Sequence, residues 1–453
     1  MNKLLLLAAT ALSCSSLIYA EELKKSPIDS VKSFQESILP IKLIGVFEFE
    51  ANSFSQSDRQ TQNKSGFNEQ FALKSSGAIA AIFEKNLTET LKYGAKITFK
   101  TTTLPKASPK FNGSHIYLED VKLGKVTLGA DYGAMASSSV SGLDAGVAKR
   151  GASVFGISNK ITNKDGVEEE IEFSPYYDFI LDDELRPSAL DEGNTVEPSR
   201  KIVYYSPKLL NNGLQFIVSF TPDSSNSGML KTSTKKIGYT ELTDNTDRST
   251  KIKYRIPLVA TNVISAAAVF ENQITPDWAI QIGASFETGS AVQTYEKTDD
   301  STIKPKTSIK WTKQTTDSKV NDLFSWNLGA KVTYQNFAVA LSYANLGNAF
   351  GVSKNSPIYA LLSEEDKGLQ DKDTTYLAAS LGYSIGEYAV SISGFKSTTQ
   401  KTPFKFVAVG GEYKAAPNLK FFAEISHAWF NNGQDNAQEH TGSALSIGTA
   451  LSF

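Results

Sequence analysis

Apolar and polar residues alternate along most of the chain, from residue 41 to the C-terminus. The segment 323–335 is the clearest case, because Phe324 and Trp326 alternate with Ser325 and Asn327. A period of two residues places successive side chains on opposite faces of a β-strand. The pattern therefore predicts strands that each have one apolar face and one polar face.

Sixteen segments show this alternation, and the connections between them differ greatly in length. The segments are 41–53, 68–84, 91–103, 113–121, 124–132, 200–208, 213–222, 260–271, 277–288, 323–335, 337–344, 374–385, 387–397, 404–414, 419–430 and 443–453. Short and long connections alternate, and the long ones include 133–199, 223–259, 289–322 and 345–373. Short turns at one end and long loops at the other are typical of an antiparallel meander that crosses a membrane.

The number of strands and the aromatic residues favour a membrane barrel over a soluble sandwich. A sandwich of sixteen strands would divide into domains, and no linker is evident in 41–453. Phe324 and Tyr334 stand near the two ends of one apolar face, as the two aromatic girdles of a membrane barrel require. Closure removes the sheet edges that lipid does not tolerate, and sixteen strands leave an aqueous channel. The predicted fold is all-β: a sixteen-stranded antiparallel transmembrane β-barrel over residues 41–453.

Composition and motifs exclude several other classes. The chain has 453 residues, 40% of them hydrophobic, but no apolar stretch of the roughly 20 residues that a membrane helix needs. It has one cysteine, three histidines and no common catalytic, nucleotide-binding or metal-binding motif, so neither an enzyme nor a cofactor is expected. The net charge of -2 provides no basic field for nucleic acid. An enzymatic barrel that uses His427 on its lipid-facing side is the alternative from a different class.

The N-terminus has the features of an export signal. Lys3 precedes an apolar run from Leu4 to Leu12, and Ala20 provides a small residue before Glu21. This order predicts a cleaved signal peptide over 1–20, followed by a polar periplasmic segment over 21–40. A buried core helix is the alternative, and Cys14 raises a lipoprotein reading that the position of Leu12 disfavours.

Four stretches of sequence resemble the general diffusion porins of Gram-negative outer membranes. They are GVFEFEA at 45–51, YLEDVKLGKVTLGA at 117–130, KIVYYSPKLLNNGLQFIVSFTPD at 201–223 and the terminal IGTALSF, which ends on Phe453. The resemblance is closest to the sixteen-stranded trimeric porins of alphaproteobacteria. It implies a homotrimeric channel in the outer-membrane lipid that passes small hydrophilic solutes passively. It also implies that Phe453 is the signal read by the outer-membrane barrel assembly machinery.

The same resemblance implies that the third external loop folds inward and narrows the channel. The corresponding connection is 133–199, and its second half has twelve acidic and two basic residues. We expect part of this acidic half to line the constriction. Solvated acids on an external loop are the alternative, and a calcium site lacks the usual spacing of oxygen ligands. The candidate constriction residues are Glu168, Glu169, Glu170, Glu172, Asp178, Asp182, Asp183 and Glu184.

In porins, basic residues on the wall face the acids of the constriction, and the sequence offers candidates for that role. They are Lys42, Lys96, Lys100 and Lys125 on the polar faces of predicted strands, together with Arg255 before the eighth strand. Ordinary solvated charges in the lumen are the alternative for each of them. Because the acidic excess is larger than this basic set, weak cation selectivity is predicted. A substrate-specific channel or a surface-exposed adhesin remains the alternative function.

Overall fold

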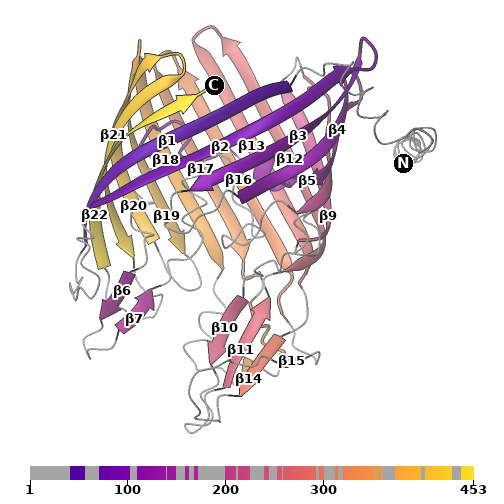
Figure 1. Cartoon of the computed structure of the whole chain (residues 1–453), viewed down its shortest axis with the longest axis vertical. Coiled ribbons are helices and arrows are strands. Elements are labelled where there is room, and N and C mark those ends of the chain that lie inside the picture. Colours follow the sequence, from indigo (N-terminus) through magenta and orange to yellow (C-terminus); the bar gives the residue numbers. More distant parts are fainter. Residues whose placement is uncertain are drawn as a thin grey trace, which may run out of the picture.

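The sixteen alternating segments form the sixteen strands of one closed antiparallel barrel (Figure 1). In this computed structural model the strands are β1 (Ile41–Gln56), β2 (Phe71–Asn86), β3 (Leu91–Thr102), β4 (Lys110–Asp120), β5 (Gly124–Ala130), β8 (Arg200–Tyr205), β9 (Leu214–Asp223), β12 (Ala260–Thr275), β13 (Trp278–Ala291), β16 (Leu323–Tyr334), β17 (Phe337–Gly347), β18 (Thr374–Ile385), β19 (Tyr388–Thr398), β20 (Phe404–Ala416), β21 (Leu419–Phe430) and β22 (His440–Ser452). Each pairs with the next in this order, and β22 pairs with β1. The predicted fold class is thus confirmed.

The structure describes only part of the chain, and the statements below refer to that part. The described residues are 41–56, 71–102, 110–138, 140–148, 159–162, 168–171, 199–210, 213–224, 239–243, 252–257, 259–291, 295–299, 312–314, 320–349, 351–356, 359–360, 373–398, 404–430 and 440–453. The predicted signal peptide 1–20 and the segment 21–40 lie outside these ranges. No helix in the described ranges is long and apolar enough to span a membrane.

The seam between the first and last strands is closed by the C-terminal residue. The backbone N–H of Gly45 donates to the carbonyl of Phe453 at 2.9 Å, and Phe453 N–H donates to the carbonyl of Gly45 at 3.0 Å. The Phe453 ring stacks on Phe47, with ring centroids 6.1 Å apart. A side chain at position 45 would collide with that ring, since an added Cβ would stand 2.6 Å from Phe453 Cζ. Glycine therefore permits the terminal phenylalanine to pack across the seam.

The two faces of each strand differ as the alternation predicts, with apolar side chains on the outside. On β16, Leu328 is 52% exposed whereas the adjacent Asn327 is 4% exposed. Aromatic pairs such as Trp278–Tyr334 and Tyr388–Tyr413, with centroids 4.6 and 5.1 Å apart, lie on neighbouring strands at the end that carries the short turns. We call this the short-turn end and the opposite one the long-loop end. An apolar exterior bounded by aromatic residues suits a barrel in lipid.

Two-residue turns at the short-turn end fix the register of the hairpins. Gln335 has a φ of 50° and Gly386 a φ of 56°, each in the two-residue turn that joins a pair of neighbouring strands. Left-handed backbone is what a tight hairpin needs in order to match the twist of its strands. Gly386 adopts it without steric cost, whereas Gln335 does so at some cost.

Several short elements in the long connections were not predicted from the sequence. They are helix α3 (Ala134–Ser138), the hairpin of β6 (Asn159–Thr162) and β7 (Glu168–Ile171), and a four-stranded sheet of β10 (Tyr239–Thr243), β11 (Ile252–Pro257), β14 (Tyr295–Asp299) and β15 (Thr312–Gln314). In Figure 1 the hairpin and the sheet lie beyond the long-loop end of the barrel. Strands of three to six residues have too little alternation to be separated from loops by periodicity alone.

Candidate functional site

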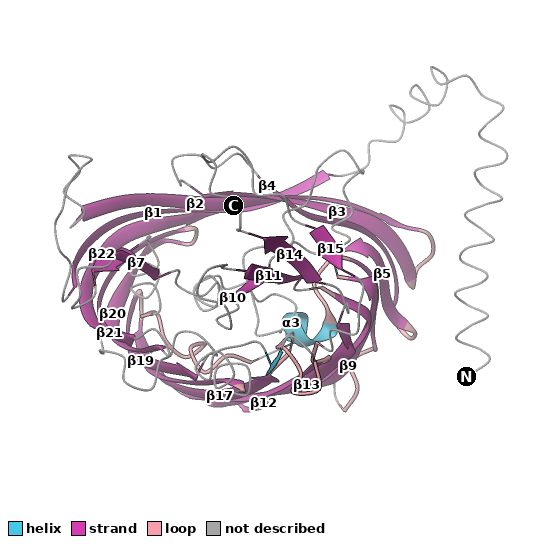
Figure 2. Ribbon diagram, turned by 90° about the horizontal axis from the view of Figure 1, so that it is seen from below, coloured by secondary structure: helices cyan, strands magenta, loops and turns pink. Residues whose placement is uncertain are grey.

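The chain that follows β5 turns into the barrel and runs along its inner wall. We call residues 133–138 and 140–148 the inner segment. Figure 2 shows its helix α3 inside the ring of strands. Most of its apolar side chains are small or of medium size and almost completely buried, whereas Ala145 and Val147 are partly exposed. The buried ones are Ala134, Met135, Ala136, Val140, Leu143 and Ala148. The inner segment therefore packs against the wall and does not stand free in the lumen.

Serine hydroxyls on the wall receive the backbone of α3. Ala134 N–H donates to Ser219 Oγ of β9 at 2.9 Å, and Met135 N–H donates to Ser265 Oγ of β12 at 2.8 Å. The first N–H groups of a helix have no partner within the helix. Wall serines satisfy two of them here, where water would otherwise have to do so.

The second half of the inner segment repeats this contact on three further strands. Serines there accept hydrogen bonds from four backbone N–H groups of the segment. The pairs are Gly142 with Ser342 of β17 at 2.7 Å, Ala145 with Ser380 of β18 at 3.2 Å, and Val147 and Ala148 with Ser391 of β19 at 2.7 and 2.9 Å. Five wall strands thus hold the backbone of the inner segment at residues 134–135 and 142–148.

Glycines on the wall allow the backbone to approach this closely. A Cβ built at Gly329 of β16 would stand 1.9 Å from the carbonyl oxygen of Val140, and one at Gly382 of β18 would stand 2.0 Å from that of Ala145. Real Cβ atoms do not come so close to backbone oxygen, so any side chain at either position would push the segment inward. Glycine in a strand commonly marks such an approach.

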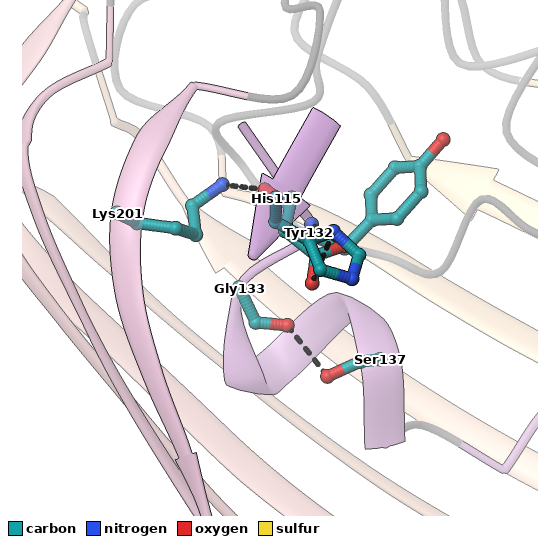
Figure 3. Close-up of polar contacts among 6 residues, drawn as sticks. His115, Tyr132, Gly133, Ser137 and Lys201 are labelled. Carbon is teal, nitrogen blue, oxygen red and sulfur yellow. Dashed lines mark hydrogen bonds and ion pairs between the residues drawn. The ribbon is translucent and has the colours of Figure 1, made fainter. Parts of the chain in front are cut away.

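The inner segment is also fixed at its root, where it leaves β5 (Figure 3). His115 Nδ1 of β4 lies 3.3 Å from Asp131 Oδ2, and Lys201 Nζ of β8 donates to the backbone carbonyl of Asp131. One turn later, Ser137 Oγ donates to the carbonyl of Gly133 at 2.8 Å. Side chains from two wall strands therefore converge on the residue at which the chain turns inward.

Charged side chains gather on the inward face of β2 to β5. Lys92 Nζ lies 3.5 Å from Glu84 Oε2 and 3.3 Å from Glu119 Oε2. Tyr117 OH donates to Glu84 at 2.6 Å, and Lys125 Nζ lies 4.4 Å from the centroid of the Tyr117 ring. This part of the wall presents paired charges to the lumen, whereas the wall beneath the inner segment presents mostly serine, glycine and alanine.

Four of the five basic residues that the sequence analysis proposed are in barrel strands. Lys42 is in β1, Lys96 and Lys100 are in β3, and Lys125 is in β5, each on the face opposite the exposed apolar residues. Arg255 is in β11, which belongs to the separate four-stranded sheet and not to the barrel. Arg255 is therefore not a residue of the barrel wall.

The acidic candidates fall in two groups. Glu168, Glu169 and Glu170 are in β7, whose hairpin lies at the long-loop end (Figure 1). Glu172, Asp178, Asp182, Asp183 and Glu184 lie outside the described residues. In the described ranges, the part of the 133–199 connection that packs on the inner wall is its almost uncharged beginning. The sequence signal for that contact was the concentration of serine and glycine on the polar faces of β9 to β19.

Comparison with known proteins agrees with the barrel fold. A model of the Gram-negative porin family matches residues 6–435. The chain belongs to this family, and it is therefore an outer-membrane β-barrel channel and not an enzyme.

Individual relatives and solved structures share less than a third of their residues with this chain. An uncharacterized protein of Rickettsia bellii is 29% identical over 400 residues, covering 85% of each chain. One of Rickettsia conorii is 27% identical over 446 residues, covering 94% of this chain and 93% of the other. A mutant of the Rh. blastica porin is 13% identical with a TM-score of 0.48, over 91% of this chain and all of that one. An anion-selective porin from Comamonas acidovorans is 9% identical with a TM-score of 0.48, over 91% and 99% of the two chains.

Proposed function

We propose that the protein is a general diffusion channel that passes small hydrophilic solutes and ions through a water-filled lumen. The observation that carries this proposal is the inner segment, which is bonded to the wall of a closed barrel of sixteen strands. A barrel of this size is wider than its own side chains fill, so a loop fixed inside it narrows the passage without closing it. The charges on β2 to β5 face that passage.

We infer that the channel works as a homotrimer in the outer membrane after cleavage of the signal peptide 1–20. Membership of the porin family supports the location and the assembly. The seam contacts of Phe453 support its role as the signal that the barrel assembly machinery reads, because the terminal residue completes the last pairing.

The second part of the proposal is a weak preference for cations. The acidic half of the 133–199 connection has more charge than the basic residues of the wall, and β7 carries three of its acids at the long-loop mouth. A charged mouth with low-dielectric walls concentrates counter-ions and so favours entry of cations.

Reversal potentials across planar bilayers with a tenfold salt gradient test this selectivity. We expect the wild type to prefer cations, and neutralisation of Glu168, Glu169, Glu170 and Glu172 to glutamine to reduce that preference. The matched control removes acids from the opposite mouth, with Asp277→Asn and Glu387→Gln in short turns. Anion preference in the wild type, or the same potential after the fourfold change, would assign selectivity to Lys42, Lys96, Lys100 and Lys125 instead.

A substrate-specific channel is the second candidate, and one observation favours it. The sheet of β10, β11, β14 and β15 lies beyond the long-loop end in Figure 1 and overlies the opening in the end-on view of Figure 2. Liposome swelling with sugars and amino acids of graded size distinguishes the two functions. A general channel gives rates that fall steadily with solute size, whereas a specific channel admits one class faster than its size predicts.

A further inference from the structure

Two lysines stand directly opposite each other on the outside of the barrel. Lys396 of β19 and Lys405 of β20 are register partners, and both are exposed. They share the outward face with Ile392 of β19 and with Val407 and Val409 of β20, which are also exposed. Both lie within a few residues of the long-loop ends of their strands. They therefore project outward where the apolar band ends.

The electrostatic energy of this lysine pair is unfavourable unless an anion binds between the two ammonium groups. Like charges directly opposite on one face of an antiparallel pair repel each other. In the described part of the chain, neither lysine is paired with an acidic side chain. The outward positions of β18 to β22 carry no carboxylate, because Glu412 and Glu424 lie on the inward face. Within its described residues the chain thus places two cations side by side and supplies no carboxylate to neutralise them.

The residues beside the lysines are those that favour the polar boundary of a membrane. Trp429 of β21 is the register partner of Lys405, so the two lysines and the indole form one row across three strands. One row nearer the middle of the strands, His427 Nδ1 and Ser443 Oγ are hydrogen-bonded at 2.8 Å, and the His427 ring meets Trp429 edge-on at 4.5 Å. Tryptophan in a membrane protein concentrates at the level of the lipid headgroups. The lysine pair therefore lies at that level.

The surface just below the lysines has room for a lipid chain. Gly394 follows Lys396 on the outward face, and the nearest atom to a Cβ built there is a backbone oxygen 3.8 Å away. Its partner on β18 is Ala379, another small residue. Beyond this row the outward face consists of larger apolar residues such as Ile392 and Val409. A polar contact at the boundary is thus continuous with an apolar surface toward the membrane centre.

We propose that Lys396 and Lys405 together bind the phosphate group of a lipid in the outer leaflet. Lysine ammonium groups form strong charge-assisted hydrogen bonds to phosphate oxygens, and two of them on one face can hold one phosphate between them. The phosphate removes the repulsion between the lysines, and the acyl chains lie along the apolar face over Gly394. The site is outside the lumen, so it is independent of the selectivity proposed above.

Native mass spectrometry of the purified protein in detergent tests the site with lipid A, a phosphorylated glycolipid, as the probe. We expect the wild type to retain lipid A. The double variant Lys396→Gln/Lys405→Gln should bind it at least about tenfold more weakly, because two charge-assisted contacts are lost. The variant Lys396→Arg/Lys405→Arg should retain binding. Phosphatidylcholine, which has no net charge, should not be retained by either protein.

The matched control is Lys85→Gln, which removes an exposed lysine of β2 at the short-turn end. It should leave lipid A binding unchanged, and heat-modifiable mobility should show that every variant is folded. Single-channel conductance of the double variant should equal that of the wild type, which separates this site from the channel. Equal binding of lipid A by the double variant and the wild type would overturn the proposal. Displacement of lipid A from the wild type by an equal concentration of inorganic phosphate would also overturn it. Loss of the oligomer in the double variant would assign the lysines to a contact between copies and would also overturn it.

Discussion

The inner wall of the barrel is built in two different ways on its two sides. From β9 to β20 the inward residues beneath the inner segment are mostly serine, glycine and alanine, and they receive a backbone. From β2 to β5 they include lysine, glutamate, histidine and tyrosine, which pair with one another or with Asp131 just after β5. On one side small residues let the backbone of the inner segment approach the wall closely, and on the other side charged side chains face the lumen.

The difference shows how a loop can be held inside a channel without filling it. A backbone can lie flat on a strand only where the side chains beneath it are very short and offer a hydroxyl acceptor. Long charged side chains need space and water around them, or a specific partner such as the carbonyl of Asp144 that Lys331 contacts, so they are few where the inner segment covers the wall. The two compositions therefore separate the structural wall from the wall that meets passing ions.

The largest expected effect is a single methyl group at Gly329. The added Cβ of Gly329→Ala would lie 1.9 Å from the carbonyl oxygen of Val140, and both are backbone-defined positions that cannot rotate away. We expect a loss of about 1–3 kcal/mol in the free energy of unfolding and a changed single-channel conductance, because the inner segment must move. Urea unfolding and bilayer recordings measure the two effects.

Gly411→Ala of β20 is the control for this change. Its Cβ would meet its nearest atom, the carbonyl oxygen of Ala389, at 3.5 Å, which is ordinary contact. Equal effects of the two alanines would show that the inner segment does not depend on close approach to β16.

A smaller effect is expected from removing one hydroxyl of the covered wall. Ser391 accepts hydrogen bonds from the N–H groups of Val147 and Ala148, and Ser391→Ala leaves both donors without this partner. An unsatisfied donor that is fully buried costs about 1–3 kcal/mol. Because Val147 is only partly buried, water can replace the hydroxyl there, and the loss in the free energy of unfolding should be smaller than that of Gly329→Ala. Hydrogen exchange should become faster at the amides of Val147 and Ala148, with little change elsewhere.

Ser393 provides a control two residues away on the same buried face. Its hydroxyl has no hydrogen-bond partner within the described part of the chain, so Ser393→Ala should be neutral or slightly stabilising. Faster exchange at Val147 and Ala148 in Ser393→Ala as well would mean that the serines act by packing and not as acceptors.

The sequence predicted the barrel more completely than it predicted the inner segment, for a physical reason. Alternation with a period of two is repeated sixteen times, and each strand reports its own faces, as Leu328 and Asn327 do. The path of the inner segment depends on pairs such as Gly142 and Ser342, which are 200 residues apart. Neither residue shows by itself that it has such a partner. The family resemblance implied an inward loop, but only the structure shows that, among the described residues of this connection, 133–138 and 140–148 lie on the wall.

The smallest effect on stability, and the sharpest test of the comparison, is expected from lysines on the two walls. Lys125 belongs to the charged wall, where it lies over the Tyr117 ring, and Lys96 projects from the same wall. Lys331 belongs to the covered wall, and its Nζ donates to the carbonyl of Asp144 in the inner segment at 2.9 Å. Removing positive charge from the lumen lowers the local concentration of anions and raises that of cations. Lys96→Gln/Lys125→Gln should therefore shift the reversal potential toward stronger cation preference. Lys331→Gln should instead loosen the inner segment and alter conductance more than selectivity. If Lys331→Gln shifted the reversal potential as much as the double variant while conductance stayed constant, the covered wall would contribute to the field, and the division between the two walls would fail.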